Sequence, residues 1–333
     1  MKRTTLQWCS VVLGCCCAVL LLRQPTAWSA EKNLQVLATT FPIYQLTRNI
    51  AAGASGVEVD LMIPAQMGCP HDYGLTPQDM RKLAKADVLI INGLGMEEFL
   101  GAPLKKANPK LKIVDSSQGI ANILQYSETG EAKEEHRHAE GKDHHDQDVH
   151  EDEHEHHHHD GANPHLFASP RMAALLAGNI AKALAEIHPA GAAVYAANAK
   201  TYGQRLNQLA DELAALGKRL RNNRIVTQHG VFDYLARDMG LEVAAVVQAH
   251  AGQEPSAAEI LKIVAVVKTK KAGAIFTEPQ YPESVGATIA KEAGIASARL
   301  DPGANGPEQA PLEYYEQVMR TNLNTLEKTL GSN

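Results

Sequence analysis

Four polar side chains of metal-binding types stand where expected elements begin or end: three at the ends of short apolar runs and one, His165, just before a helical pattern. They are His71 in "GCPHDYG", His165 in "ANPHLFASP", His229 in "VTQHGVF" and Asp301 in "RLDPGANG". Three neutral imidazoles and one carboxylate form the donor set that suits a tetrahedral Zn²⁺ ion. Proline or glycine lies close to each residue and restricts the backbone that directs its side chain. Taken singly, each is more often a hydrogen-bonded turn residue than a ligand, and Asp301 before Pro302 could simply begin a turn.

A run rich in histidine and acid is the most conspicuous stretch of the chain. "HRHAEGKDHHDQDVHEDEHEHHHH", at 136–159, contains ten of the fifteen histidines, and thirteen acids against three bases give 127–160 a net charge of −10. This composition cannot form a packed core, so we expect a disordered loop at about 127–161. We interpret it as a weak, multi-site zinc collector or an occupancy sensor, with a plain solvated insertion as the alternative. Its position inside the chain argues against an affinity tag.

Two further histidines lie outside both groups. His188 in "AEIHPAG" is expected at a helix end, and His250 in "VQAHAGQEP" is expected in a loop. The helix dipole favours a histidine at a helix end, and neither residue is expected to bind metal.

The elements that must position the four candidate ligands form two series. Apolar runs at 34–41, 57–63, 86–95 and 112–117 alternate with helical patterns, and a second series follows at 224–230, 241–248, 272–279 and 296–302. This alternation predicts an α/β fold of two similar lobes, each a mainly parallel sheet flanked by helices. In such sheets ligands bind beyond the carboxyl ends of the strands, where the four side chains would project.

One long amphipathic segment separates the two series. In 190–222 a single apolar stripe is formed by Tyr195, Tyr202, Leu206, Leu209, Leu213, Leu216 and Leu220. A helix of this length would span roughly 45 Å and could act as a rigid rod between the lobes, although an ordinary core helix fits the same pattern. The expected domains are therefore an N-terminal lobe at 31–189, a linking helix at 190–222 and a C-terminal lobe at 223–333. Helices are also expected to begin after Thr76 and after Ser169, each followed by proline.

The first thirty residues are typical of a cleaved export signal. "MKRTT" supplies the basic start, Trp8–Leu22 the apolar stretch, and "PTAWSA" small residues for cleavage. The mature chain is therefore expected to begin near residue 31 and to work in the periplasm. Lipid attachment at Cys15 fits less well, because it would leave "CCCAVLLL" at the mature terminus. Only Cys69 would remain after cleavage, so no internal disulfide is expected.

Composition excludes one broad class of function. The chain is 44% hydrophobic and 21% charged with a net charge of −6, as in soluble globular proteins, and its 333 residues suffice for two cores. Outside the acidic loop and the signal, the charges sum to only +1. Nucleic-acid binding is therefore not expected, because it requires a basic face.

Several segments together resemble a known family. The chain is similar to the metal-specific solute-binding proteins of ABC importers, most closely the ZnuA-like zinc group of the metal-binding cluster A-I family. The matching segments are "HDYGLTPQDMRKLAKADVLIINGLGMEEFL", "ANPHLFASP", "QHGVFDYLARDMGL", "FTEPQYP" and "LDPGANG", with an acidic His-rich insertion before "NPH".

The resemblance implies a fold and a ligand set. Two α/β lobes joined by one long rigid helix would hold the metal between them. His71, His165 and His229 would match three ligands, and Asp301 a carboxylate that some members use as the fourth, with water or a nearby acid as alternatives.

Three more residues lie near the expected site. Glu278 and Asp72 are candidates for hydrogen bonding to the ligands, with solvated or helix-capping roles as the alternative. Cys69, two residues before the first histidine, is expected to be a small turn residue.

The resemblance also implies a function. The protein would be a monomer that captures Zn²⁺ in the periplasm and delivers it to the membrane permease of an ABC importer, not an enzyme. Manganese import is the alternative, but manganese-type relatives have a carboxylate where this chain has His229. A secreted zinc hydrolase is disfavoured because HExxH occurs only inside the acidic His-rich run, at 150–154 and 154–158, and the sequence has no GxSxG and no evident general base beside the four candidate ligands. An adhesin role stays open.

Overall fold

The computed structural model describes residues 32–68, 70, 73–126, 161–248 and 254–331. Residues 33–333 belong to one compact unit, and the description below concerns this unit. His71, Asp72, Cys69, His250 and the His-rich run lie outside the described residues.

Two four-stranded parallel sheets organise the chain. The N-terminal sheet has the order β2-β1-β3-β4 and the C-terminal sheet the order β6-β5-β7-β8. The strands are β1 Leu34–Ala38, β2 Val57–Leu61, β3 Val88–Ile91, β4 Lys112–Asp115, β5 Arg224–Thr227, β6 Glu242–Val246, β7 Ala274–Thr277 and β8 Ala296–Arg299. All eight fall in the predicted apolar runs, which confirms the two-lobed α/β fold. Each strand ends before the polar residues that close its run, so those residues lie at the carboxyl edge of a sheet.

Nine α-helices connect and cover the strands within the described residues. They are α1 Phe41–Ala51, α2 Pro77–Lys85, α3 Gly101–Ala107, α4 Pro170–Ile187, α5 Ala192–Gly217, α6 Asp233–Met239, α7 Ala257–Lys270, α8 Ser284–Ala293 and α9 Tyr314–Leu330. Two predicted helix starts are confirmed. Thr76 and Asp79 form a capping box at α2, and the Ser169 hydroxyl accepts from the first amides of α4.

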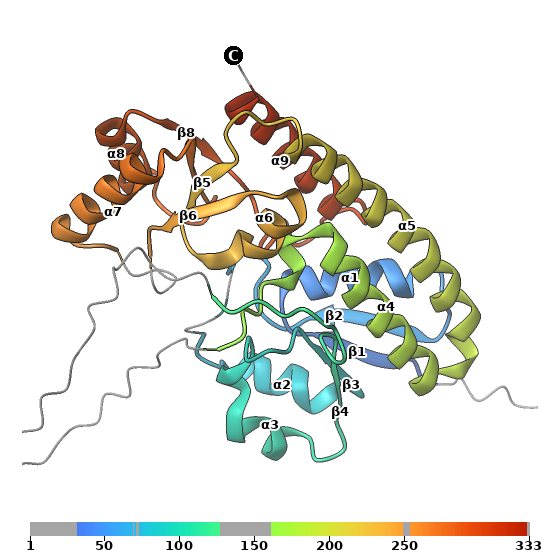
Figure 1. Cartoon of the computed structure of the whole chain (residues 1–333). Helices are drawn as coiled ribbons and strands as arrows, with labels where there is room; N and C mark the ends of the chain where they lie inside the picture. The colour runs from blue at the N-terminus through green and yellow to red at the C-terminus, as the bar shows by residue number, and fades with distance from the viewer. Residues whose placement is uncertain (1–31, 69, 71–72, 127–160, 249–253, 332–333) are drawn as a thin grey trace, which may run out of the picture. The chain divides into compact units, whose positions relative to one another are not determined.

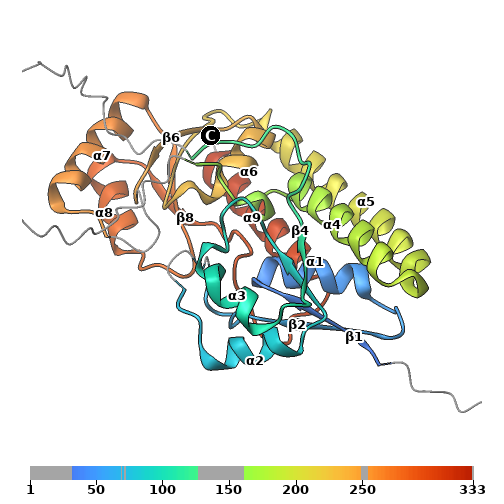
Figure 2. The same ribbon diagram turned by 90° about the horizontal axis from the view of Figure 1, so that it is seen from below.

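One hydrophobic core is shared by both sheets. Because successive side chains of a strand point to opposite faces, Val36 and Ile90 face α1 and α4, while Leu37 and Leu89 face α2 and α3. In the C-terminal sheet, Phe276 joins the same core as Val36, whereas the opposite face packs on α7 and α8 (Figure 2). Inner-face residues of the two sheets therefore belong to one continuous core, together with the helices that pack between them.

Helix α5 contacts elements of both lobes. It forms a hairpin with α4 and also touches α1, α6 and α9 (Figure 1). Six of the seven residues of the predicted stripe are buried in it, whereas Leu220 lies beyond its end at Gly217. Gly217 permits a close approach, since a Cβ there would lie 1.9 Å from the Met239 carbonyl oxygen. The helix is thus shorter than 190–222, and the lobe boundaries on either side of it stay a prediction.

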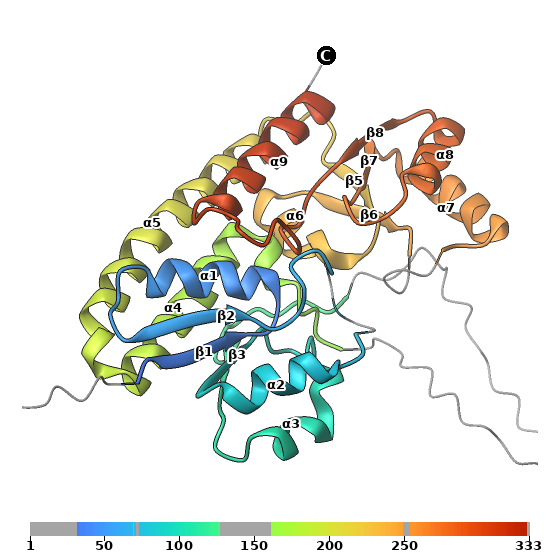
Figure 3. The same cartoon turned by 180° about the vertical axis from the view of Figure 1, so that it is seen from behind.

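The chain crosses back to the N-terminal lobe before its last helix. Arg48 and Asn49 of α1 donate to the carbonyl oxygens of Ala310 and Leu312, at 2.7 and 2.9 Å. Figure 3 shows this segment lying along α1. Among the described residues, no helix combines the length and apolar composition needed to cross a bilayer.

Candidate metal site

His165 lies in the short segment that leads into α4. It is fully buried, and both its backbone N–H and its ring Nδ1 lie close to the Asn163 side-chain oxygen, at 3.0 and 2.9 Å. The Asn163 amide nitrogen donates to the Gly230 carbonyl and to Asp233 Oδ2, at 2.7 and 3.0 Å. This orientation turns the amide oxygen toward His165, so Nδ1 carries the proton and Nε2 keeps its lone pair.

His229 follows β5 and is fixed in the same way by an acid. Its Nδ1 lies 2.6 Å from Glu278 Oε1, and Glu278, which follows β7, is completely buried. The other carboxylate oxygen accepts from Gln280 Nε2 at 2.6 Å. Since a carboxylate accepts the Nδ1 proton, Nε2 is again the basic nitrogen. The sequence-based suggestion that Glu278 hydrogen-bonds to a ligand candidate agrees with this contact.

The two imidazoles are adjacent although 64 positions separate them in the sequence. Their ring centroids are 5.1 Å apart with the planes at 78°. Tyr126 lies edge-on to His165 at 5.8 Å, and Tyr281 lies edge-on to His229 at 5.9 Å. Aromatic rings therefore flank the pair.

Asp301 lies just past β8 and is only half-buried. Its Oδ1 accepts from the Gly303 amide at 2.8 Å, and its backbone is held by two hydrogen bonds with Asn322 of α9. Burial raises the pKa of the Asp301 carboxyl; the Gly303 hydrogen bond opposes this, and the negative charge of Glu278 adds to it. Asp301 is therefore close enough to Glu278 to interact electrostatically.

Three of the four predicted ligands, His165, His229 and Asp301, lie among the described residues. The described residues contain no group of three histidine, cysteine or acidic side chains arranged to hold a metal ion. The structure brings His165 and His229 together and places Asp301 on the same sheet edge as Glu278. His188 instead caps the end of α4, as expected, with Nδ1 2.7 Å from the Tyr195 hydroxyl.

Contacts with α6 fix the segment 163–169, which contains His165, to the C-terminal lobe. The Tyr234 hydroxyl donates to the Asn163 carbonyl at 2.7 Å, and the Ser169 hydroxyl donates to Asp238 Oδ2 at 2.6 Å. Sequence reasoning missed Asn163. The available signal was its place two residues before His165, where an asparagine oxygen can accept from the local backbone.

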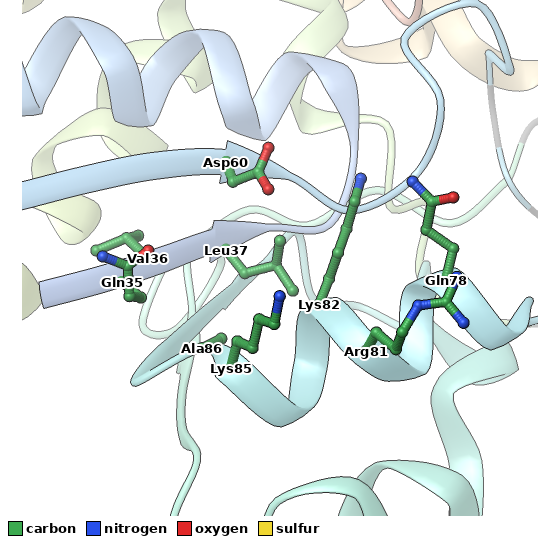
Figure 4. Close-up of a pocket in the computed structure, with 9 residues that line it drawn as sticks. All are labelled: Gln35, Val36, Leu37, Asp60, Gln78, Arg81, Lys82, Lys85 and Ala86. Carbon is green, nitrogen blue, oxygen red and sulfur yellow. The ribbon is translucent and has the colours of Figure 1, made fainter.

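A groove elsewhere on the molecule is unsuited to a cation. It has a volume of about 400 Å³ and lies between β1, the end of β2 and α2 (Figure 4). Arg81, Lys82 and Lys85 line it, with Asp60 as the acid on the opposite side. The positive charges would repel Zn²⁺, so the histidine pair is the better candidate.

Comparisons with known proteins place the chain in a family. The sequence model described as "Zinc-uptake complex component A periplasmic" matches residues 36–329. The chain is 30% identical over 304 residues to "Zinc-binding protein AdcA" of Streptococcus pyogenes serotype M3, covering 90% of this chain but only 56% of that protein. It thus spans about half the length of that relative.

Two further comparisons cover nearly full-length proteins. "High-affinity zinc uptake system protein ZnuA" of Bacillus subtilis is 30% identical over 308 residues, which are 92% of this chain and 90% of that one. The structure of the solute-binding protein FpvC of Pseudomonas aeruginosa in complex with Mn²⁺ is 28% identical, covers 90% of this chain and 99% of its own, and has a TM-score of 0.72. The predicted resemblance is confirmed: the chain belongs to the periplasmic zinc-uptake component A family, the ZnuA family.

Proposed function

We propose that this protein captures Zn²⁺ outside the cytoplasm and delivers it to the membrane permease of an ABC importer. The observation that carries the proposal is the buried pair His165 and His229, whose rings lie 5.1 Å apart and come from different lobes. Membership of a transport family supports a carrier rather than an enzyme. Zn²⁺ is then the cargo, so the site must both bind it and release it.

The proposed ligands are four. His165 and His229 would bind through Nε2, at bond lengths of roughly 2.0–2.1 Å. His71 is proposed from its sequence context alone. Asp301 is proposed because it follows β8 beside Glu278, with water as the alternative fourth ligand. Three nitrogens and one oxygen favour zinc over manganese, which prefers an oxygen-rich set.

Asn163 and Glu278 have supporting roles in this proposal. By accepting the Nδ1 protons they fix the tautomer and the direction of Nε2 before the metal arrives. A carboxylate acceptor also makes an imidazole more basic, which strengthens its bond to zinc. The shared core and the α6 contacts would restrict opening of the site to a small movement.

Competitive metal titration tests the proposal. Metal-depleted protein is titrated with Zn²⁺, Mn²⁺ and Ni²⁺ against a chromophoric chelator tight enough to keep weak sites empty. We expect one tight Zn²⁺ site per chain and Mn²⁺ binding at least about 100-fold weaker, as nitrogen donors imply. Equal affinity for Mn²⁺ would favour manganese import, and absence of any tight site would refute the carrier function. Metal-dependent hydrolysis of generic esters or phosphates would favour the enzyme alternative.

Zinc affinity is expected to fall steeply in acid. An imidazole binds metal in its neutral form, and an unperturbed imidazole takes up its proton near pH 6.5, so protons compete with zinc below that value. Between pH 7.5 and pH 5.5 the affinity should fall by more than about tenfold, since each of three histidines would lose most of its neutral form. Isothermal calorimetry across this range provides the measurement. A constant affinity would exclude histidine ligation.

Removing residues 131–159 separates the specific site from the His-rich run. We expect total bound zinc to fall, because ten histidines are lost, while one tight site remains. Elemental analysis of gel-filtered protein gives the stoichiometry, and chelator competition gives the affinity. Loss of the tight site together with the run would contradict the assignment to His71, His165 and His229.

The remaining parts of the proposal concern processing and assembly. We propose that residues 1–30 are removed on export and that the mature protein is a periplasmic monomer, with lipid attachment at Cys15 as the alternative. Intact-mass measurement of the exported protein distinguishes an N-terminus near residue 31 from a lipid-modified Cys15, and light scattering gives the oligomeric state.

A further inference from the structure

Glu97 is a buried carboxylate that is not one of the proposed ligands. It is linked through Asn92 to Pro164, the residue before His165. Glu97 follows β3 and is 8% exposed. Its Oε1 accepts from the Thr39 hydroxyl and from the Asn92 amide, both at 2.7 Å, and its Oε2 accepts from the Gly93 amide at 3.0 Å. Three donors from the ends of β1 and β3 therefore converge on one side chain.

Asn92 extends this network to the candidate ligand. Its side-chain nitrogen donates to the Pro164 carbonyl at 2.9 Å, and the whole residue is buried. Pro164 directly precedes His165, and its carbonyl lies in the same planar peptide unit as the His165 amide nitrogen, so the two move together. Glu97 thus reaches His165 through two hydrogen bonds and one short stretch of backbone.

The turn at 92–93 has little freedom to adopt another conformation. Gly93 has φ +89°, and a Cβ there would lie 2.0 Å from Asp115 Oδ1 and 2.4 Å from the Ser117 hydroxyl oxygen. Only glycine fits both the backbone angle and this space. The packing presents the Gly93 amide to Glu97, so loss of the carboxylate acceptor would leave a buried donor without a partner.

The hydrogen bonds match the ionised form of Glu97, which accepts at both oxygens. Burial raises the pKa of Glu97 to about 7; the bonds from Thr39, Asn92 and Gly93 oppose this, and the like charge of Asp115 on β4 adds to it. On protonation one oxygen becomes a hydroxyl donor, which conflicts with an amide donor already facing it. The network is therefore complete above neutral pH and weakened below it.

We infer that Glu97 is a positioning residue that holds His165 in its metal-binding orientation through Asn92 and Pro164. The inference rests on the proposed zinc function, because His165 matters only as a ligand. It adds a residue whose hydrogen bonds go to Thr39, Asn92 and Gly93 and which acts on His165 indirectly.

The test compares Glu97→Gln with the matched exposed neighbour Glu98→Gln. Zinc affinity measured by chelator competition should fall about tenfold in Glu97→Gln at pH 8 and stay unchanged in Glu98→Gln. Tenfold is the lower end of the roughly 10- to 100-fold loss expected when a residue that orients a metal ligand is replaced. The ratio of Kd values between Glu97→Gln and wild type should approach one below about pH 6, because wild-type Glu97 is then neutral as well. A purely structural defect would give the same ratio at every pH.

A second variant keeps the test valid if Glu97→Gln folds poorly. Thr39→Val removes one donor but leaves the carboxylate, so a smaller affinity loss is expected, with the pH dependence displaced upward because a bond that lowers the Glu97 pKa is gone. The imidazole NMR signals of His165 in metal-free protein supply a readout independent of zinc. They should shift in Glu97→Gln and not in Glu98→Gln.

The outcomes separate the two claims. Unchanged affinity and unchanged His165 signals in Glu97→Gln, with tight zinc binding by wild type, would overturn the positioning role alone. A pH-independent loss would also overturn it, in favour of a general folding defect. If wild type binds no zinc tightly but the His165 signals still shift, the proposed function fails while the structural link stands.

Discussion

Zinc affinity is expected to fall by more than 100-fold when His229 is replaced by glutamine. Structural zinc sites with four ligands have apparent binding free energies of about 10–16 kcal/mol, so an equal share for one ligand is roughly 2.5–4 kcal/mol. At about 1.4 kcal/mol per tenfold change, this corresponds to a factor of roughly 60 to 700. The expected loss of more than 100-fold lies within that range.

Glutamine is the appropriate replacement because of Glu278. That carboxylate is completely buried and holds His229 Nδ1 at 2.6 Å, so alanine would leave a buried charge without this donor, at a cost of about 3–5 kcal/mol in folding. Glutamine keeps an N–H donor and removes the imidazole nitrogen that would bind zinc. Chelator competition at pH 7.5 measures the affinity, and thermal unfolding without metal verifies the fold.

His188→Gln is the matched control. His188 is also half-enclosed and hydrogen-bonded, to the Tyr195 hydroxyl, but it caps α4 outside the proposed site. Its replacement should leave the zinc Kd unchanged. Equal losses in His188→Gln and His229→Gln would show that the effect arises from general destabilisation, and tight binding by folded His229→Gln would remove His229 from the ligand set.

The fold was largely predictable because its main signals are local or periodic. The inner strands β1, β3, β5 and β7 are largely buried and so appear as short apolar runs, and the polar residue that ends each run marks the sheet edge. Thr76 and Ser169 cap their helices with atoms from the next few residues, which sequence spacing alone reveals. The stripe from Tyr195 to Leu216 predicted α5 for the same reason, and only its last member, Leu220, lies beyond the helix.

The site was less predictable because its contacts join distant segments. Nothing in the local sequence pairs His229 with Glu278, 49 positions later, or Asn92 with Pro164, 72 positions later. The shared core was also missed, since an amphipathic pattern shows that a face is buried but not which element covers it. Composition drew attention to the His-rich run. The contacts that orient His165 come instead from Asn163 in "ANPHLFASP", which sequence reasoning did not single out.

Identical strand order in the two sheets places both acids after the equivalent strand, although Glu278 directly follows β7 and Glu97 lies six residues beyond the end of β3. Glu97 follows β3 and Glu278 follows β7, each the third strand in sequence and the neighbour of the first strand of its sheet. Both side chains are buried at the carboxyl edge. Glu278 fixes one candidate ligand directly, and Glu97 supports the segment of the other, so each lobe contributes one histidine and one buried carboxylate behind it.

Asn163→Ala is expected to reduce both stability and zinc affinity. The residue is fully buried and contacts the His165 backbone and ring, the Gly230 carbonyl and Asp233. Truncation leaves several of these groups unsatisfied at about 1–3 kcal/mol each, so with partial rescue by water we expect a loss of about 3 kcal/mol. Free rotation of His165 should weaken zinc binding by about 10- to 100-fold. Chemical unfolding without metal and chelator competition measure the two effects.

The comparison with Asn179→Ala decides what Asn163 contributes. Asn179 on α4 donates to two carbonyls, Ser116 and Gln118, so its truncation should also cost stability, although less because it is not fully buried. These contacts involve neither His165 nor His229, so the Asn179→Ala variant should bind zinc as tightly as wild type. An affinity loss confined to Asn163→Ala shows that hydrogen bonding across the lobes orients a ligand. Unchanged affinity in folded Asn163→Ala would mean that packing by Tyr126 and Phe167 is enough to hold the His165 ring in place.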